Sequence, residues 1–144
     1  HDALPICMKA MIFIFSSVLL LVTGNLFSQS LTLRVEGFEK VGGKLYVAIF
    51  NSEESFRKKP CAAFAVDVKD KTVIVPCKGL PIGTYAISMY QDENNNGKLD
   101  TAAFGIPTEK YGFSNDAKGV MGPPSYEKCS FSFSKDMTLT IHLN

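Results

Sequence analysis

Apolar residues recur at every second position through most of the chain, and this two-residue period is the strongest constraint on its fold. Leu31, Leu33 and Val35 share one face of a predicted first strand that ends at Gly37. This alternation is typical of a strand with one face in a core, because successive side chains of a strand point to opposite sides. The pattern predicts seven short strands, at residues 31–37, 44–51, 62–68, 72–77, 84–90, 129–133 and 137–143.

Seven strands without a predicted helix indicate an all-β fold, a two-sheet sandwich of Ig-like or prealbumin-like type. The second strand, residues 44–51, is apolar on both faces, which predicts a central position in its sheet. A polar crossover follows, with Phe56 as its expected anchor. Lys69-Asp70-Lys71 joins the third and fourth strands, and we expect these two to pair as a hairpin. The two-residue period does not predict the order of the strands within the sheets.

The first 28 residues read as a leader that is removed from the mature protein. Met8 and Lys9 form a short basic start, and the apolar run 11–22 is followed by small and polar residues. A run of this length suits a signal peptide, because a membrane span needs roughly 20 apolar residues. We expect cleavage near Ser28, or alternatively near Ser30, and a retained anchor is the other interpretation. The prediction is a secreted or periplasmic domain at residues 29–144, without a stable membrane span after cleavage.

Charge excludes one class of partner. The chain has 15 basic and 14 acidic residues, and no extended Lys/Arg run. A nucleic-acid-binding domain needs a basic surface that neutralises phosphates. We therefore predict no nucleic-acid partner, and expect a protein, peptide or glycan ligand instead.

The mature chain has three cysteines, Cys61, Cys77 and Cys129. An exported protein can form one disulfide and keep one thiol. Cys77 and Cys129 both fall on predicted core faces, so they are one possible pair. Cys61 and Cys77 are another, across the expected hairpin. Three unpaired thiols are an equally acceptable outcome, because cysteine is often buried as a small apolar residue.

Residues 91–127 form one long loop between the fifth and sixth strands, with little periodicity. A loop of this length is usually functional or disordered. Its composition predicts order, because it contains too many apolar side chains for a solvated linker. These are Phe104, Ile106, Tyr111, Phe113, Val120, Met121 and Tyr126.

The loop opens with oxygen-bearing side chains at alternate positions, then a glycine and a further carboxylate, as in the first part of an EF-hand calcium loop. Hard oxygen donors of this kind suit Ca²⁺ better than Zn²⁺. The predicted metal ligands are Asp92, Asn94, Asn96, the backbone carbonyl of Lys98, Asp100 and Glu109.

This run departs from an EF-hand in two ways. A strand precedes it, and Ala103 stands where a bidentate Glu belongs, so a remote donor must close the shell. Glu109 is the candidate, with Glu93 or a loop carbonyl as alternatives. With so few carboxylates we expect a dissociation constant on the order of 10⁻⁴–10⁻³ M. The alternative is an Asx-rich turn whose side chains cap their own backbone without any ion.

The run 105–115 mixes aromatic rings, glycines, a carboxylate and an amide. Such a surface is able to bind a ligand. Aromatic residues in long ordered loops usually bury themselves, however, so we expect Tyr111 and Phe113 to pin the loop onto the sandwich.

Three runs carry a family resemblance: PIGTYAISMYQDENNNGKLD, GIPTEKYGFSN and GPPSYEKCSFSF. They resemble a family of exported bacterial proteins known only as a domain of unknown function, with the pattern PxGxYAxxxxxDxNxNGxLD…GxPxExYGFSN. The resemblance extends over nearly the whole mature chain and implies an exported β-sandwich domain. It implies no catalytic residue, because the family has no established activity. The turn before the fifth strand also bears a weaker similarity to carboxypeptidase-regulatory and transthyretin-like domains.

The residues give catalysis little support. His142 is the only mature histidine, and no CxxC or HExxH spacing is present. The least implausible enzyme is a hydrolase that pairs Asp92 or Asp100 with Glu109. The predicted function is therefore a non-catalytic exported domain with a calcium-binding loop. A metal-free structural domain is the first alternative and the carboxylate hydrolase the second.

Overall fold

The computed structural model describes residues 28–144, and these form a mostly β structure. The all-β fold is confirmed, with eight strands where about seven were expected. The strands are β1 (Leu31–Glu36), β2 (Lys44–Phe50), β3 (Ala62–Asp67), β4 (Val73–Cys77), β5 (Gly83–Asp92), β6 (Tyr111–Phe113), β7 (Phe131–Phe133) and β8 (Met137–His142). The described residues also contain one short helix, α2 (Tyr126–Cys129), and two 3₁₀ turns, η1 (Ala103–Gly105) and η2 (Ser114–Asp116).

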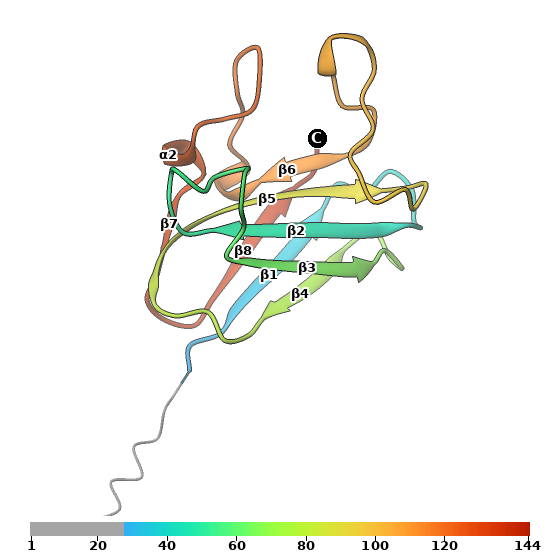
Figure 1. Ribbon diagram of the computed structural model, residues 1–144. Helices are drawn as coiled ribbons and strands as arrows, with labels where there is room; N and C mark the ends of the chain where they lie inside the picture. The colour runs from blue at the N-terminus through green and yellow to red at the C-terminus, as the bar shows by residue number, and fades with distance from the viewer. Residues whose placement is uncertain (1–27) are drawn as a thin grey trace, which may run out of the picture.

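The strands form two sheets that face each other as a sandwich (Figure 1). One sheet has the order β4-β1-β8, and in it β1 runs antiparallel to β4 and parallel to β8. The other has the order β3-β2-β5-β6. The far edge of β5 is shared, because β7 pairs with its first residues and β6 with residues 88–90. The predicted central position of β2 is confirmed, since it lies between β3 and β5.

The main core lies between the two sheets and follows from the two-residue period. Leu31, Leu33 and Val35 of β1 are fully buried, and they face Leu45, Val47 and Ile49 across the sandwich in one continuous apolar cluster. Burying side chains of this size stabilises a fold by about 1.5–3 kcal/mol each. Alternation therefore placed the inward faces of these strands correctly.

A second, smaller core covers part of the outer face of the β2–β5 sheet. Phe113 and Cys129 are buried there together with Ala86 of β5. Phe56, from the crossover after β2, packs edge-on against Phe50 at 5.4 Å and against Tyr126 at 5.7 Å between ring centroids. The expected anchoring role of Phe56 is confirmed, and so is the pinning role of Phe113.

The expected hairpin of the third and fourth strands is wrong. β3 pairs with β2, whereas β4 pairs with β1 in the opposite sheet. Val68 continues the β3 side, because it exchanges backbone hydrogen bonds with Gly42 and Gly43. The chain then crosses between the sheets before β4 begins. Period-2 alternation fixes which side chains point inward, and it is equally compatible with either partner strand.

Cys61, Cys77 and Cys129 are all unpaired within the described residues. Cys129 ends α2 instead of leading a strand, and it lies in the outer core, whereas Cys77 lies in the core between the sheets. The β2–β5 sheet therefore separates the two thiols that were expected to share a core. Burial raises the pKa of both to about 11, so they stay protonated at neutral pH and are poor nucleophiles. Cys61 is exposed.

One long loop was expected at residues 91–127, but β6 divides this segment in two. Two loops project side by side from the same end of the sandwich (Figure 1). We call residues 101–108 the first prong and residues 118–125 the second prong. No helix within residues 28–144 is long and apolar enough to cross a membrane. The predicted leader and signal peptide lie outside the described residues.

Candidate functional site

The predicted metal loop, residues 92–100, starts where β5 leaves its sheet and ends at the base of the first prong. Its first residue, Asp92, is fully buried and still pairs in register with Lys44 of β2. Asn94 and Asn96 are exposed, and Asp100 is half-buried. The loop therefore begins inside the sheet and opens to solvent.

Asp92 holds the loop in a tight bend through its side chain. Its Oδ1 accepts a hydrogen bond from the backbone N–H of Asn96 at 3.2 Å, and its Oδ2 accepts one from Gly97 at 2.8 Å. Gly97 has φ +78°, a conformation that favours glycine. The carboxylate thus compensates for its burial by binding two backbone donors, as buried charges must.

Asp100 closes the other end of the loop. Its Oδ2 accepts from Nδ2 of Asn94 at 2.5 Å, and its Oδ1 accepts from Nδ2 of Asn96 at 2.7 Å. The amide oxygens of the two asparagines turn the other way and accept backbone N–H groups, of Asn96 at 3.3 Å and of Lys98 at 3.1 Å respectively. The side chains of Asn94 and Asn96 therefore meet at Asp100, and the backbone N–H of Asn96 also binds Asp92.

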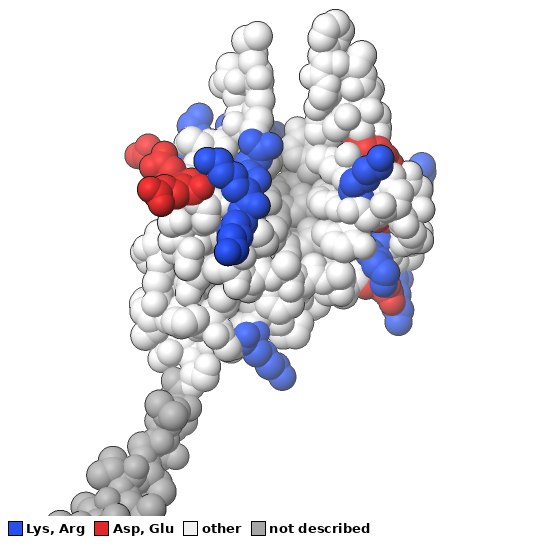
Figure 2. All heavy atoms as spheres, in the orientation of Figure 1, with Lys and Arg blue, Asp and Glu red and all other residues white. Residues whose placement is uncertain are grey.

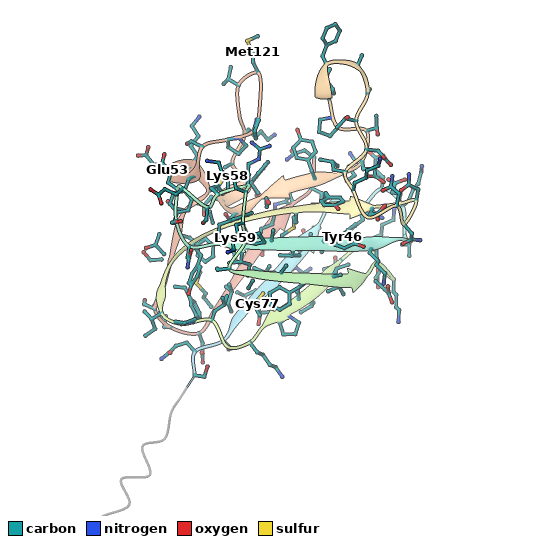
Figure 3. All side chains as sticks on the ribbon, in the orientation of Figure 1. Tyr46, Glu53, Lys58, Lys59, Cys77 and Met121 are labelled. Atoms are coloured by element: carbon teal, nitrogen blue, oxygen red, sulfur yellow. The ribbon has the colours of Figure 1, made fainter. Side chains whose placement is uncertain are left out.

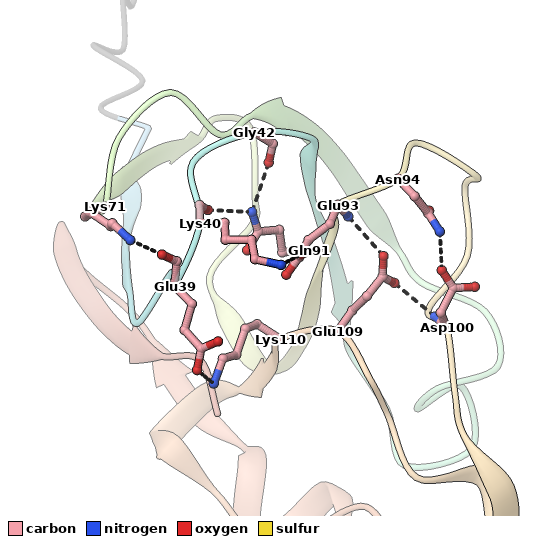
Figure 4. A network of polar contacts seen from close by, with 10 residues as sticks. All are labelled: Glu39, Lys40, Gly42, Lys71, Gln91, Glu93, Asn94, Asp100, Glu109 and Lys110. Carbon is pink, nitrogen blue, oxygen red and sulfur yellow. Dashed lines mark hydrogen bonds and ion pairs between the residues drawn. The ribbon is translucent and has the colours of Figure 1, made fainter.

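Glu109 clamps the two ends of this loop together (Figure 4). It is only 8% exposed, and its carboxylate accepts from the backbone N–H of Glu93 at 3.0 Å and of Asp100 at 2.9 Å. Both oxygens are thereby engaged with the backbone of the loop. Within residues 28–144, no three His, Cys, Asp or Glu side chains lie close enough together to hold a metal ion by themselves. Any ion here would need asparagine and backbone oxygens as well.

Further contacts fix the base of the loop to the sandwich. Gln91, fully buried, donates from Nε2 to the carbonyls of Lys40 and Gly42, both at 2.9 Å (Figure 4). Gly43 has φ +66°, and a side chain there would collide with the backbone of Asp92. The sequence interpretation missed Gln91, although its position in phase with buried Met89 was a usable signal.

Tyr90 ties the loop to the outer face of the sheet. Its ring stacks on Tyr46 of β2 at 5.3 Å between centroids, and its hydroxyl donates to the carbonyl of Gly97 at 3.2 Å. Tyr46 lies on the face of β2 that is turned toward the viewer in Figure 3. Partial burial, with the nearby Asp92 carboxylate, raises the pKa of Tyr90, which keeps the hydroxyl a donor.

The second prong is tied down by Ser114 and Asn115, two residues of the motif that carried the family resemblance. Ser114 Oγ accepts from the backbone N–H of Ile87 at 2.9 Å and donates to the carbonyl of Cys129. Asn115 Nδ2 donates to the carbonyls of Lys128 and Ser130, at 3.1 and 2.8 Å. Both side chains therefore hold the α2 segment against β5 and β6.

His142 adds a further link at this base. Its Nδ1 lies 2.7 Å from Oδ2 of Asp116, and its Nε2 lies 3.3 Å from Oε2 of Glu36. Its backbone N–H also donates to Asp116 at 2.8 Å. The hydrogen bond that the Asp116 carboxylate accepts raises the pKa of His142. Burial of Asp116 acts to raise its own pKa, but the hydrogen bonds from the backbone and ring of His142 outweigh burial, so the pKa of Asp116 is lowered. The side chain of His142 is exposed.

The arrangement disfavours the paired-carboxylate hydrolase. Asp92 and Glu109 are both buried, and each uses both oxygens to bind backbone amides. Two hollows lie at the opposite end of the described structure from the prongs (Figure 1). One is lined by residues 28–30 and 78–79, and the other by residues 28–29 and 135–136. Neither is lined by the carboxylates of the loop.

Comparisons with known proteins found one family. Comparisons with curated proteins and with solved structures found no match. The family model described as "Uncharacterized protein conserved in bacteria (DUF2141)" matches residues 33–141, which include residues 92–100 and both prongs. The predicted membership of an uncharacterised bacterial family is thereby confirmed, whereas the transthyretin-like similarity stays a prediction. The chain belongs to this family of uncharacterised proteins conserved in bacteria.

Proposed function

We propose that this protein is an exported, non-catalytic β-sandwich whose loop 92–100 binds Ca²⁺ and supports the binding of a protein, peptide or glycan ligand. The observation that carries the proposal is the grouping of two carboxylates and two amides in one loop. Asp92, Asn94, Asn96 and Asp100 would supply side-chain oxygens, and Lys98 its backbone carbonyl. Glu109 would hold the ends of the loop in place by its bonds to two backbone amides.

Two asparagine rotations would convert the loop from an ion-free to an ion-bound form. Nδ2 of Asn94 and of Asn96 now point at Asp100, so two positively polarised NH₂ groups lie where a cation would lie. Turning each amide by about 180° exchanges its nitrogen for its oxygen. Four to five oxygens would then surround one position, which is the donor type that Ca²⁺ prefers.

The same contacts predict weak binding. Calcium must replace the hydrogen bonds of 2.5 and 2.7 Å to Asp100, and only two carboxylates are available to it. The rotations also break the bonds that the amide oxygens accept from the backbone N–H groups of Asn96 and Lys98. A dissociation constant on the order of 10⁻⁴–10⁻³ M is expected for such a site. That range fits the calcium concentrations of an extracellular setting and so agrees with the predicted export through residues 1–28.

A metal-free structural domain is the second candidate, and one observation favours it. The carboxylates of Asp92, Asp100 and Glu109 all have hydrogen-bond donors within the protein. The loop is therefore able to fold without an ion. The two candidates therefore differ in whether calcium increases the stability of the folded protein.

Thermal unfolding with calcium and with a chelator separates the two candidates. At about 10 mM calcium, a site with the expected affinity stabilises the fold by about 1.4–2.7 kcal/mol. The melting temperature of the wild type should therefore be several degrees higher with calcium than with chelator. The variant Asp100→Asn should show a smaller difference. Equal melting temperatures in calcium and chelator would favour the metal-free domain.

The variant Asn96→Asp makes the test sharper. Without calcium, the new carboxylate faces Asp100 where an NH₂ group now donates, so the variant should have a lower melting temperature than the wild type. With calcium it adds a charged ligand, so the rise should exceed that of the wild type. If the loop binds no metal, the variant should have a lower melting temperature without calcium and no larger rise with calcium. Asn51→Asp, at an exposed position outside the loop, is the matched control.

A further inference from the structure

The tips of the two prongs carry large apolar side chains that are exposed and belong to neither core. Phe104 and Met121 are fully exposed, at 101% and 104%, and Ile106 and Val120 are largely exposed. Figure 3 shows Met121 at the outer end of the second prong. Monomeric proteins expose single apolar residues often, but four such residues at two adjacent points indicate an interaction site.

Both tips are built turns that hold these side chains outward. In the first prong, the N–H of Ala102 donates to the carbonyl of Ile106 at 2.7 Å, and Phe104 has φ +62°. In the second, a side chain at Gly119 would collide with the backbone of Gly122, and Met121 has φ +57°. Left-handed conformations at non-glycine residues cost energy and cluster at functional sites.

The charge distribution sets the tips apart from the rest of the surface. Residues 101–108 and 119–125 contain no charged side chain, although charged residues make up 20% of the chain. The groups below the two prongs differ. Lys118 begins the second prong, and Arg57, Lys58 and Lys59 lie in the crossover after β2, whereas the first prong lies between Asp100 and Glu109. Phe56 packs on Tyr126, which attaches this crossover to the base of the second prong. Figure 2 shows basic groups beneath the left projection with acidic groups to its left, and acidic and basic groups mixed beneath the right projection.

We propose that the two prongs insert their apolar tips into the interfacial region of a phospholipid bilayer. Apolar side chains of surface-bound proteins enter the boundary of headgroups and acyl chains by about 5–10 Å, and basic residues behind them meet anionic headgroups. Two separate convex tips fit a deformable lipid surface. A stable protein interface involves about 20–30 residues on each side, whereas the tips offer four large side chains. The proposal is independent of calcium in loop 92–100.

Vesicle binding by the chain from residue 28 onward tests this directly, because that chain contains both sheets and both cores but lacks the predicted signal peptide. The chain has no tryptophan, so Phe104→Trp or Met121→Trp introduces a single fluorophore at one tip. With phosphatidylcholine vesicles containing phosphatidylglycerol, the emission of both variants should shift to shorter wavelength and be quenched by lipids brominated on their acyl chains. Ile74→Trp, at an exposed apolar position of β4, should show neither change.

Serine variants give the second readout. Phe104→Ser and Met121→Ser should each weaken vesicle binding about tenfold and leave the melting temperature unchanged, because these side chains are exposed and belong to neither core. Lys58→Gln with Lys59→Gln should weaken binding to phosphatidylglycerol vesicles alone. Unshifted tip fluorescence with saturating vesicles, or full binding by a Phe104→Ser, Met121→Ser double variant, would overturn the proposal. So would self-association that the double variant abolishes, because the tips would then bind a second copy of this chain.

Discussion

Phe113 and Phe104 lie nine positions apart in the same segment and have opposite environments. Phe113, in β6, is 7% exposed and packs with Ala86 and Cys129, whereas Phe104, at the tip of the first prong, is 101% exposed. Their difference follows the division of the segment into a base and two tips. The base is ordered by the outer core and by hydrogen bonds to the backbone. The apolar side chains at the tips lie in solvent and belong to neither core.

This comparison shows how a small sandwich displays apolar groups without losing its fold. The stabilising contacts of Glu109, Ser114 and Asn115 all end at the base. Changes at the tips should therefore affect binding, and changes at the base should affect stability. Three substitutions test this division.

The largest effect is expected from Phe113→Ala. Removing a buried phenylalanine costs the transfer free energy of the ring and leaves a cavity, about 3 kcal/mol of unfolding free energy. Phe104→Ala is the matched control and should change it by less than about 0.5 kcal/mol. Urea denaturation of both variants gives the two values. Similar losses in both would remove the distinction between base and tip.

An intermediate effect is expected from Glu109→Gln. The carboxylate accepts two backbone amides in a buried position, and glutamine offers one acceptor oxygen and turns an NH₂ group toward the other amide. Leaving a buried donor unpaired should cost about 1–3 kcal/mol of unfolding free energy. Glu54→Gln, at an exposed position, should cost nothing measurable by the same denaturation. Equal stability of the two variants would contradict the clamp.

The smallest effect is a pH dependence at His142. Because the folded pKa of His142 is raised, its contact with Asp116 stabilises the fold fully below the ordinary histidine value of 6.5 and is lost as pH rises through the raised pKa. Asp116 has a lowered pKa, so its contribution is lost in the opposite direction, as pH falls through that pKa. Asp116→Asn should bring the His142 pKa back toward 6.5, which an NMR titration of the imidazole protons measures. A titration midpoint that does not move would exclude Asp116 as the cause.

The inward faces of the strands were predictable because burial imposes a period that sequence records directly. Leu33 and Val47, for example, are buried as the period predicts. Strand partners left no such record, so β3 and β4 were paired wrongly. Three-residue β6, Tyr-Gly-Phe, is too short for alternation to identify.

The candidate site divides in the same way. The spacing of Asp92, Asn96 and Asp100 predicted that they share a loop, because a glycine bend brings alternate side chains together. Glu109 was predicted to close the loop as a metal ligand, and it does lie at the loop. Its bonds to two backbone amides were not predictable, since amides that need an acceptor leave no residue pattern. Composition also predicted order for Phe104 and Met121 without showing that tight turns hold them in solvent.

The side-chain amides of Asn94 and Asn96 report most directly on calcium binding to loop 92–100. In the ion-free form both NH₂ groups donate to Asp100, and calcium requires both to rotate away. A calcium titration followed by NMR should move both NH₂ resonance pairs together, with one saturable midpoint on the order of 10⁻⁴–10⁻³ M, and Asp100→Asn should shift that midpoint to higher calcium. Resonances that stay in place up to about 10 mM calcium, tenfold above that range, would contradict a calcium-binding loop.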